Sequence, residues 1–410
     1  MARLRGMTWI LVSAIVLCAH AGDAAESHGG LLIIRPHSFI DVRTGREVVG
    51  GKIVVRDGLI VAAGAKAGAG NKGAVVLDLP KLYLLPGFID SHTHLVWSGP
   101  PGESQAEAAA RATLNAGFTT VRNLGATQNA DISFKRRSDK TPMPRLLAAG
   151  MGLGAPGGTC EQVFGAEGNL RTAEDAARTV KQLVAAGADV IKVCAGGGVF
   201  FDPNRPAEVE LTPALLEAVV SEAHRLGKKV AAHAQGSAAV VNAVNAGVDS
   251  IEHGGILSDE AIALMAKRGT AYVPTLARLD WAYKTAQERG APEQQLSRLL
   301  KRRNDAYASA RHAFEGGVKI IFGSDASVLP HGRNAMEFRA LAEIGLSPQQ
   351  VIRAATLDAA ELLGRDDIGS IRAGGVADLV GFERNPLLDP SVLEQPAWVM
   401  RNGVVVFPSK

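Results

Sequence analysis

Residues 82–95, LYLLPGFIDSHTHL, join a buried-strand pattern to two histidines. The apolar run is broken at Pro86 and Gly87, resumes for two residues, and leads to His92 and His94. Strand side chains alternate between two faces, so both histidines should point to the same side. Two neutral imidazoles on one face can hold a metal ion. Since the pair could equally be two hydrogen-bonded loop histidines, the motif alone does not decide.

The length of the chain fits a barrel of about 250 residues together with a smaller satellite. Its 410 residues are 47% hydrophobic and 21% charged, which is typical of a globular enzyme with a large core. The 44 basic residues nearly balance the 41 acidic ones, giving a net charge of +3. Because no basic stripe interleaves with aromatic residues, the composition does not predict nucleic-acid binding.

The N-terminus has the three-part pattern of a secretory signal peptide. Two arginines precede an apolar run at 9–18, and small residues at 19–25 offer cleavage sites. The run is shorter than the roughly 20 residues that a transmembrane helix needs, so the mature form should have no membrane span. A lipoprotein acylated at Cys18 is disfavoured because a bulky leucine precedes it. We expect residues 1–25 to be removed and the protein to be periplasmic or secreted.

Export would leave two cysteines, Cys160 and Cys194. They can form one disulfide in an oxidising compartment, and the sequence leaves open whether they do. Cys194 is two residues from Lys192 and shares its face of a predicted strand. We expect Cys194 to line the pocket floor rather than to bind a metal.

Both ends of the mature chain are predicted to form short strands with tight turns. Residues 30–84 alternate apolar and polar positions around Gly-Gly and Asp-Gly turns, and residues 368–407 contain an Asn-Gly hairpin signal. Since neither fragment is large enough alone, we expect residues 26–85 and 367–410 to pair into a small composite β-sandwich.

Between these ends, short apolar strands alternate with amphipathic helical patterns, including a long one near 277–316. Eight strands alternating with helices predict an α/β fold, a (β/α)8 TIM barrel over residues 86–366. The predicted strands are 88–92, 119–123, 145–149, 190–194, 230–234, 250–253, 271–275 and 319–324.

Potential metal ligands gather at the ends of these strands, where a barrel has its active site. Singly, a buried histidine, a capping aspartate or a Schiff-base lysine would explain each of them. Together on one rim they favour a metal site. The candidates are His92, His94, Lys192, His233, His253 and Asp325.

This arrangement of ligands resembles the amidohydrolase superfamily. The strings PGFIDSHTHL, TTVRNLG, IKVCAGGGV, AAHAQG, SIEHGG and HGRNAMEF are similar to those of its imidazolonepropionase-like branch. That branch includes Xaa-Pro dipeptidases, carboxypeptidase-like enzymes and amidases that hydrolyse ochratoxin. The resemblance covers nearly the whole mature chain.

The resemblance implies two divalent metal ions, for which zinc suits the nitrogen and oxygen ligands. By this likeness His92, His94 and Asp325 would hold the first ion and His233 and His253 the second, with Lys192 bridging as a carbamate formed with carbon dioxide. A hydroxide shared by the metals would attack an amide carbonyl. Asp325 would then pass its proton to the leaving nitrogen.

Further site residues are predicted from the loops. His331 resembles a family histidine that could bind the oxyanion or a substrate carboxylate, although it could also be a solvent-facing loop residue. Arg278 or Arg333 could meet a substrate carboxylate. Predicted substrate contacts are Gly197, Gly198, Val199 and Arg333.

Two positions depart from the family pattern. Thr159 stands where many relatives have a histidine after paired glycines, and Asn123 follows Arg122 where an aspartate is usual. Neither is a predicted ligand, but the first could alter substrate choice. We expect Arg122 to be structural.

Several functions compete at this stage. The substrate would be a small amide or dipeptide, such as an Xaa-Pro dipeptide or an N-acyl amino acid. A one-metal deaminase or a hydrolase of cyclic amidines or imidazolones would lack the bridging lysine. A non-catalytic scaffold would have broken ligands, and a Schiff-base aldolase would leave the rim histidines unexplained. A homo-oligomer is expected only by analogy with relatives.

Overall fold

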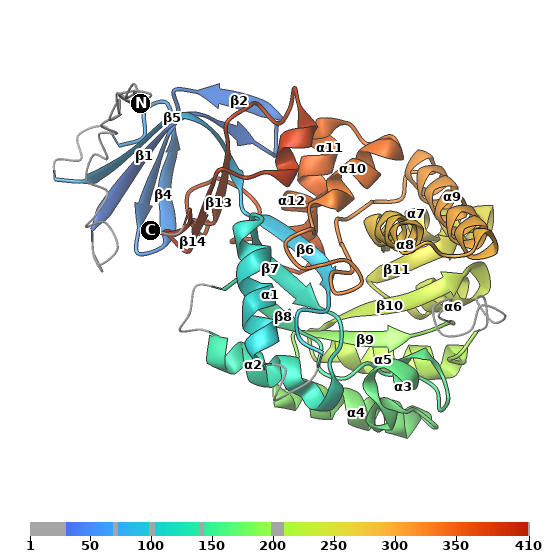
Figure 1. Ribbon diagram of the computed structural model, residues 1–410. Coiled ribbons are helices and arrows are strands. Elements are labelled where there is room, and N and C mark those ends of the chain that lie inside the picture. The colour runs from blue at the N-terminus through green and yellow to red at the C-terminus, as the bar shows by residue number, and fades with distance from the viewer. Residues whose placement is uncertain (1–29, 69–72, 98–102, 139–142, 198–208, 409–410) are drawn as a thin grey trace, which may run out of the picture.

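The computed structural model describes residues 30–68, 73–97, 103–138, 143–197 and 209–408, and Figure 1 shows how their elements are arranged. The predicted signal peptide, residues 1–25, lies outside these ranges. Among the helices in the described ranges, none combines the length and apolar character that crossing a bilayer requires.

The two ends of the chain meet in one mixed sheet of eight strands, ordered β15-β14-β13-β5-β1-β3-β4, with β2 paired to β1. These strands are β1 (Leu31–Asp41), β2 (Arg46–Val49), β3 (Lys52–Arg56), β4 (Leu59–Gly64), β5 (Val75–Pro86), β13 (Leu379–Phe382), β14 (Trp398–Arg401) and β15 (Val404–Phe407). The antiparallel pairing of β5 with β13 joins the two halves, with Leu84 opposite Gly381.

The predicted composite sandwich is therefore seen as a single sheet in the described residues. The strand β5 has 12 residues and pairs in parallel with β1 on one side, while its last residues pair with β13 on the other. This one long strand therefore joins the strands of both ends of the chain in a continuous sheet. The predicted Asn-Gly hairpin is confirmed, since Asn402 and Gly403 have φ of 53° and 78°, as a type I′ turn requires.

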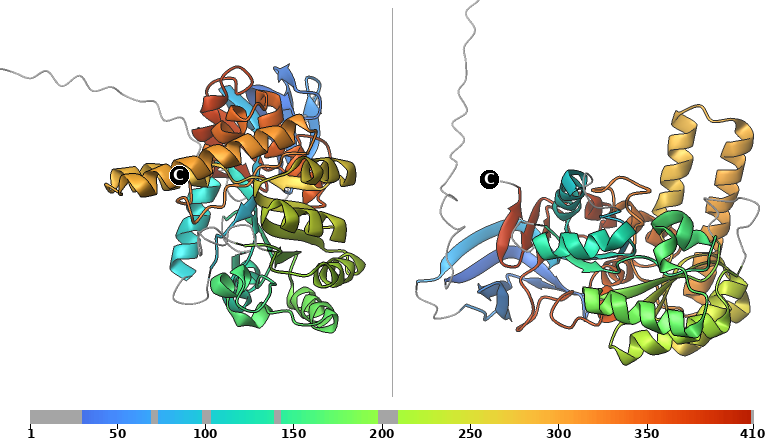
Figure 2. Two further views of the ribbon diagram at one scale, coloured as in Figure 1. Left: turned by 90° about the vertical axis from the view of Figure 1, so that its right-hand side faces the viewer. Right: turned by 90° about the horizontal axis from the view of Figure 1, so that it is seen from below.

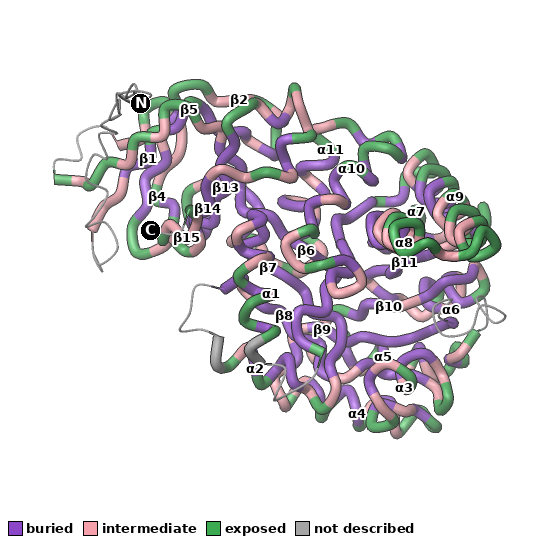
Figure 3. Tube along the Cα trace, in the orientation of Figure 1, coloured by how far each residue is buried: buried purple, intermediate pink, exposed green. Residues whose placement is uncertain are grey.

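Seven strands of the central region form two parallel sheets, one ordered β6-β7-β8 and the other β12-β11-β10-β9. Their bounds are β6 (Phe88–Thr93), β7 (Phe118–Asn123), β8 (Arg145–Ala148), β9 (Val190–Cys194), β10 (Lys229–Gly236), β11 (Ser250–Ile256) and β12 (Ala271–Val273). Every residue of β6, β7 and β9 is buried, as expected of parallel strands covered on both faces (Figure 3). The predicted α/β alternation is thus present.

The predicted eighth strand, 319–324, is not a regular strand. Tyr272 of β12 forms a single bridge to Ile320, and Thr93 of β6 forms another to Ala326. Lys319 and Ile321 bond to Tyr272 of β12, whereas the Phe322 carbonyl accepts from Ser91 of β6 and the Phe322 N–H donates to Ala354, so no continuous ladder forms on either side. The segment nevertheless links the edge strands of the two parallel sheets.

Twelve α-helices accompany the described strands. They are α1 (Glu103–Asn115), α2 (Ala130–Ser138), α3 (Thr159–Phe164), α4 (Ala173–Ala186), α5 (Pro213–Arg225), α6 (Ser237–Ala246), α7 (Asp259–Arg268), α8 (Ala277–Glu288), α9 (Glu293–Glu315), α10 (Met336–Glu343), α11 (Pro348–Ala354) and α12 (Leu357–Leu362). Local signals fix several ends: Thr172 caps α4 at its start, and Gly187 ends it in the left-handed conformation.

The long helix predicted near 277–316 is wrong, because two helices occupy this stretch. Gly290 has φ of 69°, and Pro292 cannot continue a helix from its N-terminal side, so α8 ends before them and α9 begins after them. The two helices project from the body as a hairpin (Figure 2).

Aromatic packing fills the beginnings of the first two parallel strands. Phe88 opens β6 and Phe118 opens β7, and both rings contact Phe338 of α10, at centroid distances of 4.8 and 6.1 Å. Phe88 also contacts Phe382 of β13, which ties the end sheet to the central region. The opposite ends of the strands are left to polar residues, and the candidate site lies there.

Candidate metal centre

His92, His94 and Asp325 form a buried group whose potential ligand atoms lie within 4.8 Å of one another. Asp325 Oδ1 is 3.5 Å from Nε2 of both histidines. The histidines end β6, and the backbone N–H of Asp325 donates to the carbonyl of His92 at 2.7 Å. The prediction that the two histidines converge is confirmed.

A buried carboxylate orients the first histidine. Glu252 Oε2 lies 2.7 Å from His92 Nδ1, while its Oε1 accepts from Arg122 at 2.9 Å and from Ser250 at 2.6 Å. When Nδ1–H donates to this carboxylate, the lone pair of Nε2 faces Asp325. That Nε2 atom is buried and makes no hydrogen bond within the described residues. A carboxylate behind a histidine is the usual support of a metal ligand.

His233 and His253 lie beside this group, outside the set whose atoms converge within 4.8 Å. Their ring centroids are 4.6 Å apart, and the ring of His253 is 4.8 Å from that of His92. His233 Nε2 is also buried without a hydrogen-bond partner in the described part of the chain. His253 Nδ1 is 2.8 Å from the Thr275 hydroxyl.

Lys192 of β9 is almost completely buried, at 2% exposure. Burial lowers its pKa to about 8, although the carboxylates of Glu252 and Asp325 act against this shift. The buried lysine is therefore much more often neutral than an exposed one, and a neutral amine is the form that adds to carbon dioxide.

The electrostatics favour neutral imidazoles next to an ionised aspartate. Burial lowers the pKa of His92, His233 and His253 well below the usual value, and that of His94 to about 4. Burial alone would raise the pKa of Asp325, but the attraction of nearby His92 and Arg278 outweighs it and the pKa is lowered. Neutral imidazole and carboxylate are the forms that bind metals.

The donor set fits divalent zinc. It offers nitrogen and oxygen atoms, its imidazoles are neutral, and two Nε2 atoms are buried without a hydrogen bond in the described residues. A buried polar atom without a partner is costly unless something binds it.

The residues predicted from the loops lie at different distances from the metal centre. His331 is partly buried, with Nδ1 3.4 Å from the Thr113 hydroxyl, and burial lowers its pKa to about 4 while a bond with the backbone of His94 acts against this. It thus lies against the centre and not in solvent. The backbone of Gly197 contacts His233, whereas Arg333 is exposed. Gly198 and Val199 are outside the described residues.

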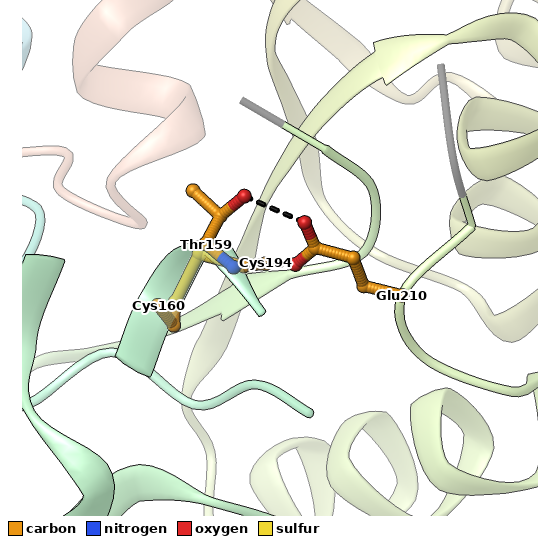
Figure 4. Close-up of a disulfide and its surroundings, with 4 residues drawn as sticks. All are labelled: Thr159, Cys160, Cys194 and Glu210. Atoms are coloured by element: carbon orange, nitrogen blue, oxygen red, sulfur yellow. Dashed lines mark hydrogen bonds between the residues drawn. A yellow bond between two sulfur atoms is a disulfide. The ribbon is translucent and has the colours of Figure 1, made fainter. Parts of the chain in front are cut away.

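Cys160 and Cys194 form a disulfide, which answers the question left open by the sequence (Figure 4). It ties α3 to the end of β9, two residues beyond Lys192. Thr159 donates to Glu210 through both its backbone N–H, at 2.9 Å, and its hydroxyl, at 2.6 Å. The position that departs from the family pattern therefore anchors this loop.

Sequence reasoning missed Glu252, Thr275 and the role of Arg278. Glu252 directly precedes His253 in β11, so strand alternation would put the two on opposite faces. His253 has φ of 71°, which breaks the alternation and lets both side chains reach the centre. One signal in the sequence could have indicated Glu252. It lies two residues after Ser250, so both side chains are expected on the same face of the strand, where they do form a hydrogen bond.

Residues 83–406, most of the chain, match the model of the amidohydrolase family. The chain belongs to this family. The match confirms the predicted family, and together with the relatives that follow it supports the predicted class of enzyme, a hydrolase acting on amide bonds.

Individual relatives of this amidohydrolase agree with the family assignment. An ochratoxinase of Aspergillus niger is 27% identical and matches 84% of this chain and 79% of its own length. An imidazolonepropionase of Mycolicibacterium smegmatis is 27% identical over 87% of this chain and 91% of its own. The crystal structure of a Xaa-Pro dipeptidase with bound methionine superposes with a TM-score of 0.83 at 31% identity, covering 92% of this amidohydrolase and 99% of that chain.

Proposed function

We propose that this amidohydrolase uses two divalent metal ions to cleave the amide bond of a dipeptide or an N-acyl amino acid. One observation carries the proposal. Two buried imidazole nitrogens, Nε2 of His92 on β6 and Nε2 of His233 on β10, make no hydrogen bond within the described residues, and both rings interact electrostatically with Lys192. Each of these nitrogens belongs to the ligand set of a different proposed ion, which supports two metal sites.

In this proposal each side chain has a separate task. His92, His94 and Asp325 would hold the first ion and His233 and His253 the second. Lys192, as a carbamate formed when its neutral amine adds to carbon dioxide and releases a proton, would bridge them. Zinc ions bound there would supply an activated water and Lewis-acid polarisation of the scissile carbonyl.

The chain's own residues would move the proton and steady the charge. Asp325 is ionised and buried, so it can accept a proton and return it to the leaving nitrogen. His331, which lies against the backbone of His94, can donate a hydrogen bond to the negative oxygen of the tetrahedral intermediate. Glu252 keeps His92 in the ligating tautomer.

The relatives support the proposed substrate class. One is a Xaa-Pro dipeptidase and another an ochratoxinase. A substrate with an acyl group on an amino acid, leaving a free carboxylate on the released half, fits both names. Lys192 disfavours the alternative of a one-metal deaminase or imidazolone hydrolase.

We further propose the domain division expected from sequence. Residues 86–366 would close into a (β/α)8 barrel, supported by the bridges of 319–324 to β12 and β6. Residues 26–85 and 367–410 would form the satellite domain, and residues 1–25 an export signal that leaves a periplasmic or secreted enzyme.

The test is a screen of zinc-reconstituted enzyme against Xaa-Pro dipeptides, other dipeptides and N-acyl amino acids. We expect amide hydrolysis that a chelator abolishes and zinc restores, with two zinc ions per chain. Lys192→Ala should lose activity and the second equivalent of metal, and short carboxylic acids should restore part of the activity; Lys181→Ala, an exposed lysine on α4, is the control. Activity confined to cyclic ureas or nucleobases, or full metal content and activity in Lys192→Ala, contradicts the proposal.

A further inference from the structure

A buried polar path connects one ligand of each proposed ion. His253 Nδ1 lies 2.8 Å from Thr275 Oγ1, and Arg278 Nε donates to the same oxygen at 2.9 Å. Arg278 Nε is also 3.3 Å from Asp325 Oδ2. Thr275 follows β12 and Arg278 lies in the first turn of α8, so one short segment of the chain reaches both ligands.

The path is isolated from solvent. Thr275 is 0% exposed and Arg278 is 2% exposed, although arginine is rarely fully buried. The suggestion that Arg278 meets a substrate carboxylate is therefore disfavoured by its burial and by its contact with Asp325.

Three of the four residues on this path also have an unusual backbone conformation. Thr275, His253 and Asp325 have φ of 52°, 71° and 56°, in the left-handed region that residues other than glycine rarely adopt. For a β-branched threonine this conformation is especially unfavourable. Such strain of about 1–3 kcal/mol persists only where the surrounding contacts enforce it, and it clusters at functional sites.

The donor and acceptor properties of these groups determine how each ligand is oriented. Arginine can only donate, so Arg278 fixes Oδ2 of Asp325 and leaves Oδ1 facing His92 and His94. The Thr275 oxygen has a second lone pair, which can accept Nδ1–H of His253. That bond leaves Nε2 of His253 free as a ligand.

We propose that Thr275 and Arg278 are positioning residues that fix His253 and Asp325 relative to each other. As a result, the two ion sites would form together, and a change that disrupts one would also disrupt the other. The proposal rests on the two-ion function proposed above and adds a pair of residues outside the ligand set. Loosening either residue should weaken both sites.

The test compares Thr275→Val and Arg278→Met with Thr275→Ser, which keeps the hydroxyl, and with Arg278→Lys, which keeps the positive charge but not the Nε donor. Zinc affinity is measured for each ion by competition with a chelator, without substrate, and kcat and KM are measured separately. We expect each disruptive variant to lose roughly 10–100-fold in affinity at both sites and to lower kcat with little change in KM. Serine should restore binding because it keeps the hydroxyl. Cobalt(II) absorption spectra should report the altered coordination directly.

Matched controls are Thr285→Val, a helix threonine bonded to its own turn, and Arg339→Met, an exposed arginine of α10. Unchanged zinc affinity in both disruptive variants, or a change in KM alone for Arg278→Met, overturns the proposal. Should Thr275→Val fail to fold, Arg278→Lys decides, because an ammonium cannot keep the geometry of Nε and wild-type affinity would contradict a positioning role. If the wild-type protein binds no zinc, the proposed function itself has failed.

Discussion

At the scale of single residues, the best-defined feature of the centre is the carboxylate behind His92. Glu252 is completely buried and accepts from Arg122, Ser250 and His92. It therefore holds the proton of His92 on Nδ1 in the tautomer that a metal requires.

Replacing Glu252 by glutamine should reverse this tautomer. Arg122 can only donate, so the amide oxygen will turn to it and the amide N–H will face His92 Nδ1. The ring proton then moves to Nε2, and zinc affinity should fall roughly 10–100-fold, measured by chelator competition. Glu343→Gln, which alters an exposed partner of Arg303, is the control. A folded Glu252→Gln protein with wild-type zinc affinity would show that the carboxylate is only structural.

Asp131 provides a pH dependence that is separate from the metal centre. Burial raises its pKa to about 6, although bonds from Gly150 and Asn123 act against the shift. The folded state therefore holds the proton that the unfolded state releases near its ordinary pKa of about 4. The contribution of Asp131 to stability is full below pH 4 and is lost as the pH rises through 6, by about 3 kcal/mol.

The measurement compares the unfolding free energies of wild type and Asp131→Asn between pH 3.5 and 7 in buffered denaturant. The advantage of the wild type should shrink as the pH rises, because asparagine does not titrate. A difference that stays constant across this range contradicts the assignment.

At the scale of elements, the disulfide joins α3 to β9 across 34 residues of sequence. Closing a loop of this length restricts the unfolded chain and should stabilise the fold by about 4 kcal/mol. Cys160→Ala combined with Cys194→Ala should lower the unfolding free energy by about that amount. Both cysteines are nearly inaccessible, at 1% and 2% exposure, so a reductant should act only after unfolding.

Chemical denaturation with and without reductant checks this prediction. Reduced wild type and the double variant should share one midpoint, below that of the oxidised protein. Equal midpoints for the oxidised protein and the double variant would refute a stabilising role.

At the scale of the whole molecule, the end sheet depends on strands from both termini. Deleting residues 367–410 removes β13, β14 and β15, and so exposes the edge of β5 and the apolar residues Leu84 and Leu85. An uncovered apolar strand edge favours aggregation. We expect the truncated protein to be insoluble, measured as the soluble fraction on expression beside a control that lacks only residues 409–410. Soluble truncated protein with the wild-type Tm would mean that the central region folds independently.

Much of the fold and of the centre could be predicted from local patterns. Strand periodicity placed His92 and His94 on one side, and glycine and proline marked the ends of helices and hairpins. Seven of the eight predicted strands are present, because short apolar runs between turn residues have few other stable conformations. The helix at 277–316 failed because its periodicity continues across Gly290 and Pro292.

Sequence by itself predicted the family from the resemblance of its motifs, the α/β alternation from periodicity, and six candidate ligands from residue types at the ends of predicted strands. Only the tertiary structure decided that Glu252 supports His92, 160 residues away, that Cys160 and Cys194 pair, and that the two ends share one sheet. It also revealed the left-handed backbone at His253 and Thr275. Such contacts arise from packing between distant segments, which overrides local preference and leaves no periodic signal in the chain.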